Sequence, residues 1–131
     1  MAFPIDMEMI RRTEAKLGRK LPPGYVARMR QNNGGSVETE VESWDLRPIF
    51  DDSDRTRLKR TCNDIVRETT MARQLTPDFP ASALVIGNNG GGDLLVFLVD
   101  STSDHYGNAV YWWSHETGEV AKVADDFDEL Q

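Results

Sequence analysis

A glycine-rich stretch, IGNNGGGD at residues 86–93, is the part of this sequence that most resembles a ligand-binding loop. Such loops bind phosphate when their amides and the N-terminus of a following helix converge on the anion. Here the loop leads into LLVFLV at residues 94–99, which is typical of a buried strand. The stretch also lacks the Lys-Ser/Thr pair of a P-loop and the spacing of GxGxxG. We therefore interpret it as a turn between two strands.

The residues of this turn are expected to have structural roles. Gly87, Gly90, Gly91 and Gly92 should adopt backbone angles or close approaches that other residues cannot. Asp93 should accept hydrogen bonds from amides of the loop.

Covalent catalysis by a thiol would need Cys62, the only cysteine, and either His105 or His115, the only histidines. Cys62 lies on an apolar helical stripe, where a buried thiol is a poor nucleophile. His115-Glu116 has no HExxH partner for zinc, and DDSD at 51–54 lacks the glycine and later glutamate of an EF-hand loop. We predict no enzymatic activity, no cofactor and no metal site.

Two groups of carboxylates could instead bind a basic protein: Glu38, Glu40 and Glu42 in the first, and Asp51 and Asp52 in the second. In the first group VETEVE at 37–42 alternates as a strand does, which would bury the valines and make a ladder of glutamates on the other face. The alternative is the solvated face of an edge strand, where charge discourages aggregation. For the second group the alternative is simple helix capping.

Aromatic residues form the third candidate surface. Neighbouring residues of a strand point to opposite faces, so Trp112 and Trp113 cannot share one core. If Trp112 packs under helices, Tyr111 and Trp113 lie on the other face, where exposed aromatics are typical binding hot spots. Trp44 is a similar candidate. The alternatives are that a helix or loop covers that face too, or that the tryptophans form a dimer contact.

Four segments with helical signals are expected to position these residues. The first runs over residues 6–17, from an Asp6 cap to Gly18, and the second runs from Pro22-Pro23 to NNGG at 32–35. A third helix, from Ser53, would bury one stripe consisting of Leu58, Cys62, Ile65, Thr69 and Ala72. ADDFDELQ predicts a short last helix, with Phe127 and Leu130 reaching back to the sheet.

Strand signals dominate the rest of the chain. After the alternating segment at 37–42, SWDLRPIF continues as extended chain, and Pro48 confines it to an edge or a strand end. Further strands are predicted at 83–86, 94–99, 109–113 and 119–123. The 131 residues suit a single domain, 1–131.

Composition limits the partners of this domain. A formal net charge of -7 repels the nucleic-acid backbone and favours a basic partner. No apolar run reaches the roughly 20 residues that cross a bilayer, and the start of the chain does not resemble a secretory signal. A single cysteine agrees with a reducing compartment, so we expect a cytoplasmic protein.

The order of several short motifs resembles the SUKH superfamily, which includes the fungal Smi/Knr regulators, bacterial Syd and many bacterial immunity proteins. The matching positions are Leu17-Gly18, Leu21-Pro22, Tyr25, Asn33-Gly34-Gly35, Ile86-Gly87, Gly92-Asp93, Val110, His115-Glu116 and Phe127. The resemblance implies an α+β fold, a mostly antiparallel mixed sheet of about five to six strands with helices packed on it. Residues 37–80 carry little that is diagnostic.

The resemblance also implies a function. Most bacterial members are thought to be non-enzymatic immunity proteins that bind toxin domains such as nucleases or deaminases. We therefore expect a basic toxin domain as partner, and a chain that is itself a monomer or weak dimer. The alternative is a regulatory adaptor of the Smi/Knr or Syd type that docks on a host protein. A small-molecule pocket is a third possibility without a motif in its favour.

Overall fold

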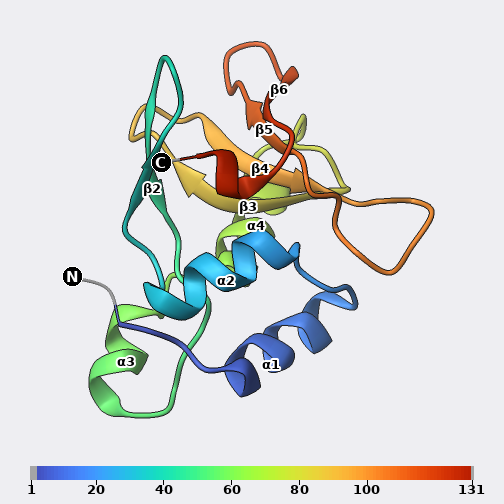
Figure 1. Ribbon diagram of the computed structural model, residues 1–131. Coiled ribbons are helices and arrows are strands. Elements are labelled where there is room, and N and C mark those ends of the chain that lie inside the picture. Colours follow the sequence, from blue (N-terminus) through green and yellow to red (C-terminus); the bar gives the residue numbers. More distant parts are fainter. Residues whose placement is uncertain (1–2, 131) are drawn as a thin grey trace.

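The computed structural model describes residues 3–130. Helices of the N-terminal half lie against a sheet formed largely by the C-terminal half, and the chain ends in a 3-10 turn, η1 (Phe127–Glu129) (Figure 1). This arrangement confirms the expected α+β class.

The two N-terminal helices form where their capping signals predict. α1 (Met7–Leu17) begins after Asp6, whose carboxylate accepts the Met9 amide at 3.2 Å, and ends at Gly18 with φ 71°. α2 (Pro23–Gln31) begins with a proline, whose missing N–H costs nothing in the first turn. Both predicted helices are therefore confirmed.

The sheet is a meander in which each strand pairs antiparallel with the next one along the chain. Within residues 3–130 its six strands, in spatial order, are β1 (Ser36–Glu38), β2 (Ser43–Leu46), β3 (Ala83–Asn88), β4 (Leu94–Leu98), β5 (Val110–Trp113) and β6 (Val120–Ala124). The strands expected after residue 82 are all present. β1 and β6 are the outer strands of this order.

The main core lies between one face of the sheet and the helices α1 and α2. Tyr25 of α2 is fully buried, and its ring meets Phe97 and Phe127 edge to face, with 5.2 Å and 5.1 Å between ring centroids. Phe127 comes from η1, which Asp126 and Glu129 hold with a capping box. The predicted return of the C-terminus to the core is thus confirmed for Phe127.

The second face of the sheet is covered as well. α4 (Ile65–Leu75) packs on β3, where the Val85 amide donates a hydrogen bond to the Thr69 hydroxyl at 2.8 Å. A smaller apolar cluster on this face contains Phe79, Val96 and Trp113. Both faces of the central strands are therefore buried.

The long helix predicted from Ser53 is wrong, because the chain forms two helices there. α3 (Arg55–Arg60) stops before Thr61, and the Asp64 carboxylate begins α4 by accepting the amides of Val66 and Arg67. The Thr61 hydroxyl donates to the Arg57 carbonyl at 2.9 Å and accepts the Asp51 amide.

The break turns the first half of the predicted stripe toward solvent. Leu58 is 42% exposed and Cys62 is exposed, whereas Ile65 and Thr69 are buried as expected. The expectation of a buried Cys62 is therefore wrong.

Candidate partner-binding surface

The predicted strand of alternating glutamates is the tip of a hairpin. β1 ends at Glu38, and the chain returns after Glu40 and Val41 with the Thr39 amide donating to the Glu42 carbonyl at 2.9 Å. Val41, expected to be buried, is 76% exposed. The three glutamates therefore do not form a ladder on one strand face.

A groove with a volume of about 640 Å³ lies between this hairpin and the C-terminal part of the chain. The hairpin, teal in Figure 1, and the red C-terminal segment lie side by side there. We call this groove the acidic groove, and the residues that define it are the carboxylates Glu38, Glu40 and Glu129 and the apolar residues Val41, Val123 and Leu130.

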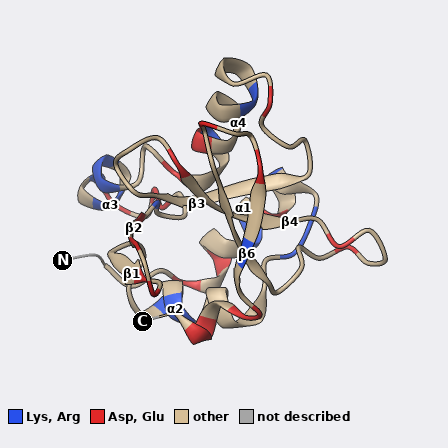
Figure 2. Cartoon of the chain, turned by 90° about the horizontal axis from the view of Figure 1, so that it is seen from above, with Lys and Arg blue, Asp and Glu red and all other residues tan. Residues whose placement is uncertain are grey.

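Negative charge dominates the acidic groove. Among the described residues that line it, Lys122 is the one cation, and its ammonium group already pairs with Asp125 at 3.0 Å. Figure 2 shows acidic residues in red near the C-terminus and α2. Glu42 does not line the groove; its carboxylate accepts a hydrogen bond from the Asn89 side chain at 3.2 Å.

Carboxylates also crowd one another in the segment that forms one wall of the groove. A hydrogen bond with Asp126 and the negative charge of that residue raise the pKa of Asp128, which is exposed. A carboxylate whose pKa is raised by another carboxylate gains from a nearby cation. Asp126 and Asp128 lie beside Gly24 of α2 and do not line the groove, so the carboxylates of the groove itself are Glu38, Glu40 and Glu129.

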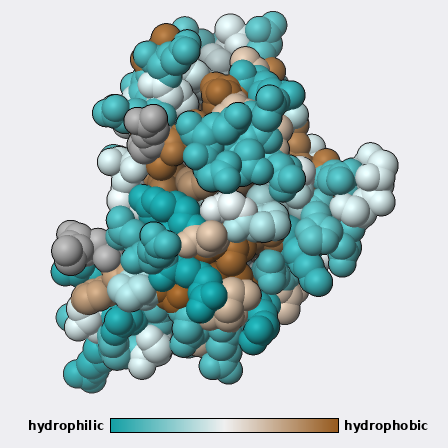
Figure 3. All heavy atoms as spheres, in the orientation of Figure 1, coloured by the Kyte–Doolittle hydropathy of each residue, from teal (hydrophilic) through white to brown (hydrophobic). Residues whose placement is uncertain are grey.

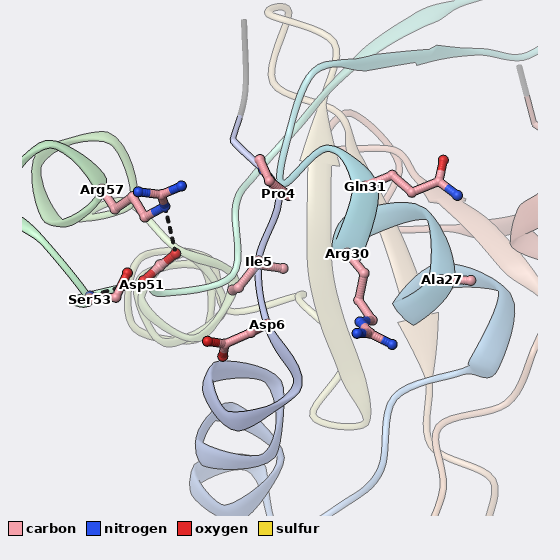
Figure 4. A pocket seen from close by; sticks show the side chains of 9 residues that line it. All are labelled: Pro4, Ile5, Asp6, Ala27, Arg30, Gln31, Asp51, Ser53 and Arg57. Carbon is pink, nitrogen blue, oxygen red and sulfur yellow. Dashed lines mark hydrogen bonds and ion pairs between the residues drawn. The ribbon is translucent and has the colours of Figure 1, made fainter.

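The second predicted acidic site is not an open carboxylate surface. The Asp51 side chain is 4% exposed, and it accepts the Ser53 amide at 3.0 Å and pairs with Arg57 at 3.6 Å. Figure 4 shows Asp51 and Arg57 joined beside a pocket of about 660 Å³. Asp52 forms two hydrogen bonds with Arg12, at 2.8 Å and 3.1 Å. Both carboxylates are thus engaged within the fold.

Of the two alternatives for the tryptophans, the structure supports a covered face, and Trp44 and Trp113 are not exposed binding residues. Trp112 does face the main core and Trp113 the opposite face, as the alternation predicts. However, Trp113 is only 2% exposed because Phe79 packs against it at 5.5 Å, and Trp44 is 0% exposed. Tyr111 is partly buried beside the same cluster as Trp113. On the face in Figure 3, hydrophobic residues show mainly in recesses between hydrophilic ones.

The glycine-rich turn has the backbone roles expected of Gly87, Gly90 and Gly92. A Cβ on Gly87 would lie 2.8 Å from the Asp45 carbonyl oxygen of β2, so glycine allows two strands to approach there. Gly90 and Gly92 have φ of 81° and 105°, whereas Gly91 is without a positive φ.

The expected role of Asp93 within the turn is wrong. The loop amides of Gly90 and Gly91 donate to the side chains of Asn88 and Asn89. The Asp93 side chain instead contacts Trp112 of β5 and His115, which follows β5.

Asp93 accepts hydrogen bonds from two residues of a distant segment. The Trp112 indole N–H donates at 2.8 Å, the His115 amide at 3.0 Å, and His115 Nδ1 lies 2.5 Å from the same carboxylate. Burial opposes the ionised form of Asp93, but these hydrogen bonds outweigh it and lower the pKa of the carboxyl group. A Cβ on Gly92 would lie 3.0 Å from His115 Nδ1, so Gly92 leaves room for this contact.

Cys62 Sγ lies 3.5 Å from the Lys59 carbonyl oxygen, and no group of three His, Cys, Asp or Glu residues in the described part of the chain is placed to hold a metal. Across the same residues, no helix has both the length and the apolar character to span a bilayer.

A comparison with models of protein families shows which family this chain belongs to. The model of the SMI1 / KNR4 family (SUKH-1) matches residues 4–130. The chain belongs to this family. The SMI1 / KNR4 match covers both walls of the acidic groove, the glycine-rich turn and the Asp93 contacts. Members of the family are generally not enzymes, and membership points to protein–protein interaction. No curated protein and no solved structure matches the chain.

Sequence reasoning identified Glu38 and Glu40 but missed the opposite wall of the groove. Leu130 was expected to reach back to the sheet from a short last helix, and Glu129 was given no binding role. The capping box of Asp126 and Glu129 was readable from their spacing, yet nothing local indicates that this turn lies beside residues 38–41.

Proposed function

We propose that this SMI1 / KNR4 family protein is an immunity protein that binds and neutralises a basic bacterial toxin domain, such as a nuclease or deaminase. The observation that carries the proposal is the acidic groove, because it combines three carboxylates with the apolar side chains of Val41, Val123 and Leu130. Family membership is consistent with this role. The protein acts by occupying a surface of the toxin and needs no chemistry of its own.

Electrostatics supports the choice of a basic partner. The net charge of -7 steers a cationic domain toward this protein and accelerates association. Glu38 and Glu40 are exposed, so pairing them with a partner costs little desolvation at the rim of an interface. Val41 and Leu130 supply apolar area that becomes buried in the complex.

The test begins with capture of the partner. The tagged protein is used to isolate partners from its native cells at low and at high salt, and the partner is identified by mass spectrometry. An immunity protein holds one basic domain at about nanomolar affinity or tighter, and rising salt slows association. The captured domain is then produced in a susceptible bacterium, alone and together with this protein.

The matched control separates the groove from net charge. Glu38→Lys with Glu40→Lys changes the formal charge by +4, from -7 to -3. Asp104→Lys with Glu116→Lys makes the same change at exposed positions outside the groove. We expect the partner to be toxic alone, and protection to be lost with the first pair of substitutions only. A non-toxic partner would instead identify an adaptor.

A further inference from the structure

The two outer strands of the sheet both border the acidic groove. β1 pairs with β2 and β6 pairs with β5, and within residues 3–130 no strand pairs with the other edge of either. Glu38 is the last residue of β1, and Val123 and Lys122 belong to β6. Unpaired strand edges offer backbone N–H and C=O groups to another extended chain.

The register shows which amides of β6 face outward. The Ser114 amide donates to the Glu119 carbonyl at 2.9 Å, which marks this pair as hydrogen-bonded. Hydrogen-bonded and non-hydrogen-bonded pairs alternate along an antiparallel ladder. Ala121, opposite Trp112, is therefore bonded inward, whereas Val120 and Lys122 direct their backbone groups to the open edge.

We propose that a basic, extended segment of the partner protein adds as a strand to the outer edge of β6 and places its lysine or arginine side chains among Glu38, Glu40 and Glu129. This inference rests on the proposed function and names how the same groove is occupied. Charge complementarity selects a cationic segment, because the lining carries the exposed carboxylates of Glu38 and Glu40 and its one described cation, Lys122, is paired with Asp125. Glu129 adds a third carboxylate, although its Oε1 also accepts the amides of Asp125 and Asp126.

An extended segment suits the groove better than a helix. Side chains of a strand alternate between two faces, so a segment with alternating basic and apolar residues can direct one set to the carboxylates and the other to Val123 and Leu130. β6 spans about 17 Å, and its regular alternation extends from Val120 to Lys122, because the register with β5 shifts at Val123. Backbone pairing then supplies affinity, and the carboxylates supply selectivity.

The test uses a synthetic peptide, acetyl-Lys-Val-Arg-Val-Lys-Val-Arg-amide. The peptide is titrated into isotopically labelled protein, and binding is followed by NMR through the chemical shifts of the backbone amides. We expect the largest shifts at Val120, Lys122 and residues 38–41, and weaker binding as salt rises. Two further peptides carry N-methyl groups at either the odd or the even positions. Both keep the charge and the side chains but block opposite edges of the extended peptide.

Strand addition predicts that one methylated peptide binds about tenfold or more weakly, through the loss of two or more hydrogen bonds, while the other keeps its affinity. Equal binding of all three peptides, or shifts that leave β6 unaffected, would overturn the proposal. The matched pairs of charge variants described above are tested in parallel, and only Glu38→Lys with Glu40→Lys should weaken peptide binding.

These outcomes separate the inference from the proposed function. Edge-specific peptide binding together with a non-toxic partner would retain strand addition and reject the immunity role. A toxic partner that this protein neutralises, together with equal binding of the three peptides, would retain the immunity role and reject strand addition.

Discussion

Trp44 of β2 and Trp112 of β5 meet edge to face, with 5.0 Å between their ring centroids and 87° between their planes. β3 and β4 lie between these two strands in the sheet, and strands three positions apart in a flat sheet would be separated by about 14 Å. The sheet is therefore strongly curled, and the two indoles are in contact on its concave face. The same curl brings the β1–β2 hairpin toward β6 and creates the acidic groove.

Removing the Trp44 ring should destabilise the fold and open the groove. Trp44→Ala deletes a fully buried side chain, for which we expect a loss of about 3–5 kcal/mol in the free energy of unfolding. Trp44→Phe keeps a ring against Trp112 and should cost less. Urea unfolding measures both, and Leu58→Ala, at a residue that is 42% exposed, is the control. A loss below about 1 kcal/mol for Trp44→Ala would contradict the role of this contact.

Acid should remove the contribution of Asp93. Its pKa is lower in the folded protein than the ordinary carboxyl value, so its stabilising effect is complete above that ordinary value and is lost as the pH falls through the folded pKa. We expect Asp93→Asn to cost about 1–3 kcal/mol at pH 7, because charged hydrogen bonds to Trp112 and His115 are lost. The difference from wild type should shrink below about pH 4. Asp104→Asn, at an exposed residue, is the control.

The close approach of β2 and β3 should make Gly87 intolerant of substitution. In Gly87→Ala the new methyl group would lie 2.8 Å from a backbone oxygen, which cannot move without shifting β2. Overpacking of this kind costs about 1–3 kcal/mol. Gly107→Ala is the matched control, because its Cβ would meet the Leu98 carbonyl oxygen at an ordinary 3.6 Å. Thermal unfolding of both variants gives the comparison, and equal melting temperatures would argue against the close approach.

Local signals predicted the fold wherever one residue determines the backbone. Asp6, Gly18 and Pro23 place the first two helices because capping, positive φ and proline act over a single turn. The late strands were predictable because they are short apolar runs between turns that contain glycine. Their alternation also assigned Trp112 and Trp113 to opposite faces.

The errors arise where tertiary contacts decide between local alternatives. VETEVE has the alternation of a strand, and the turn at Glu40 and Val41 contains no glycine or asparagine to indicate it. The stripe through Leu58 and Cys62 has helical spacing, but the Asp64 cap starts a new helix and interrupts it. Burial of Trp113 depends on Phe79, which is distant in sequence. For the same reason the groove, built from residues 38–41, 122–124 and 129–130, could be predicted only in part.

The exposed tip of the hairpin provides a test that separates stability from binding. Val41 is 76% exposed and Val37, on the same hairpin, is 3% exposed. Val41→Ser should therefore change the free energy of unfolding by no more than about 0.5 kcal/mol, whereas Val37→Ser buries a hydroxyl and loses apolar contacts at a cost of about 3 kcal/mol.

Binding of the basic peptide should be more sensitive to Val41→Ser than to Val37→Ser, because Val41 lines the acidic groove and Val37 does not. We expect Val41→Ser to weaken binding of the basic peptide measurably, and Val37→Ser to leave it nearly unchanged under conditions where the variant remains folded. Urea unfolding and titration calorimetry give the two quantities. If Val41→Ser bound the peptide as tightly as wild type, Val41 would have no part in recognition of the peptide.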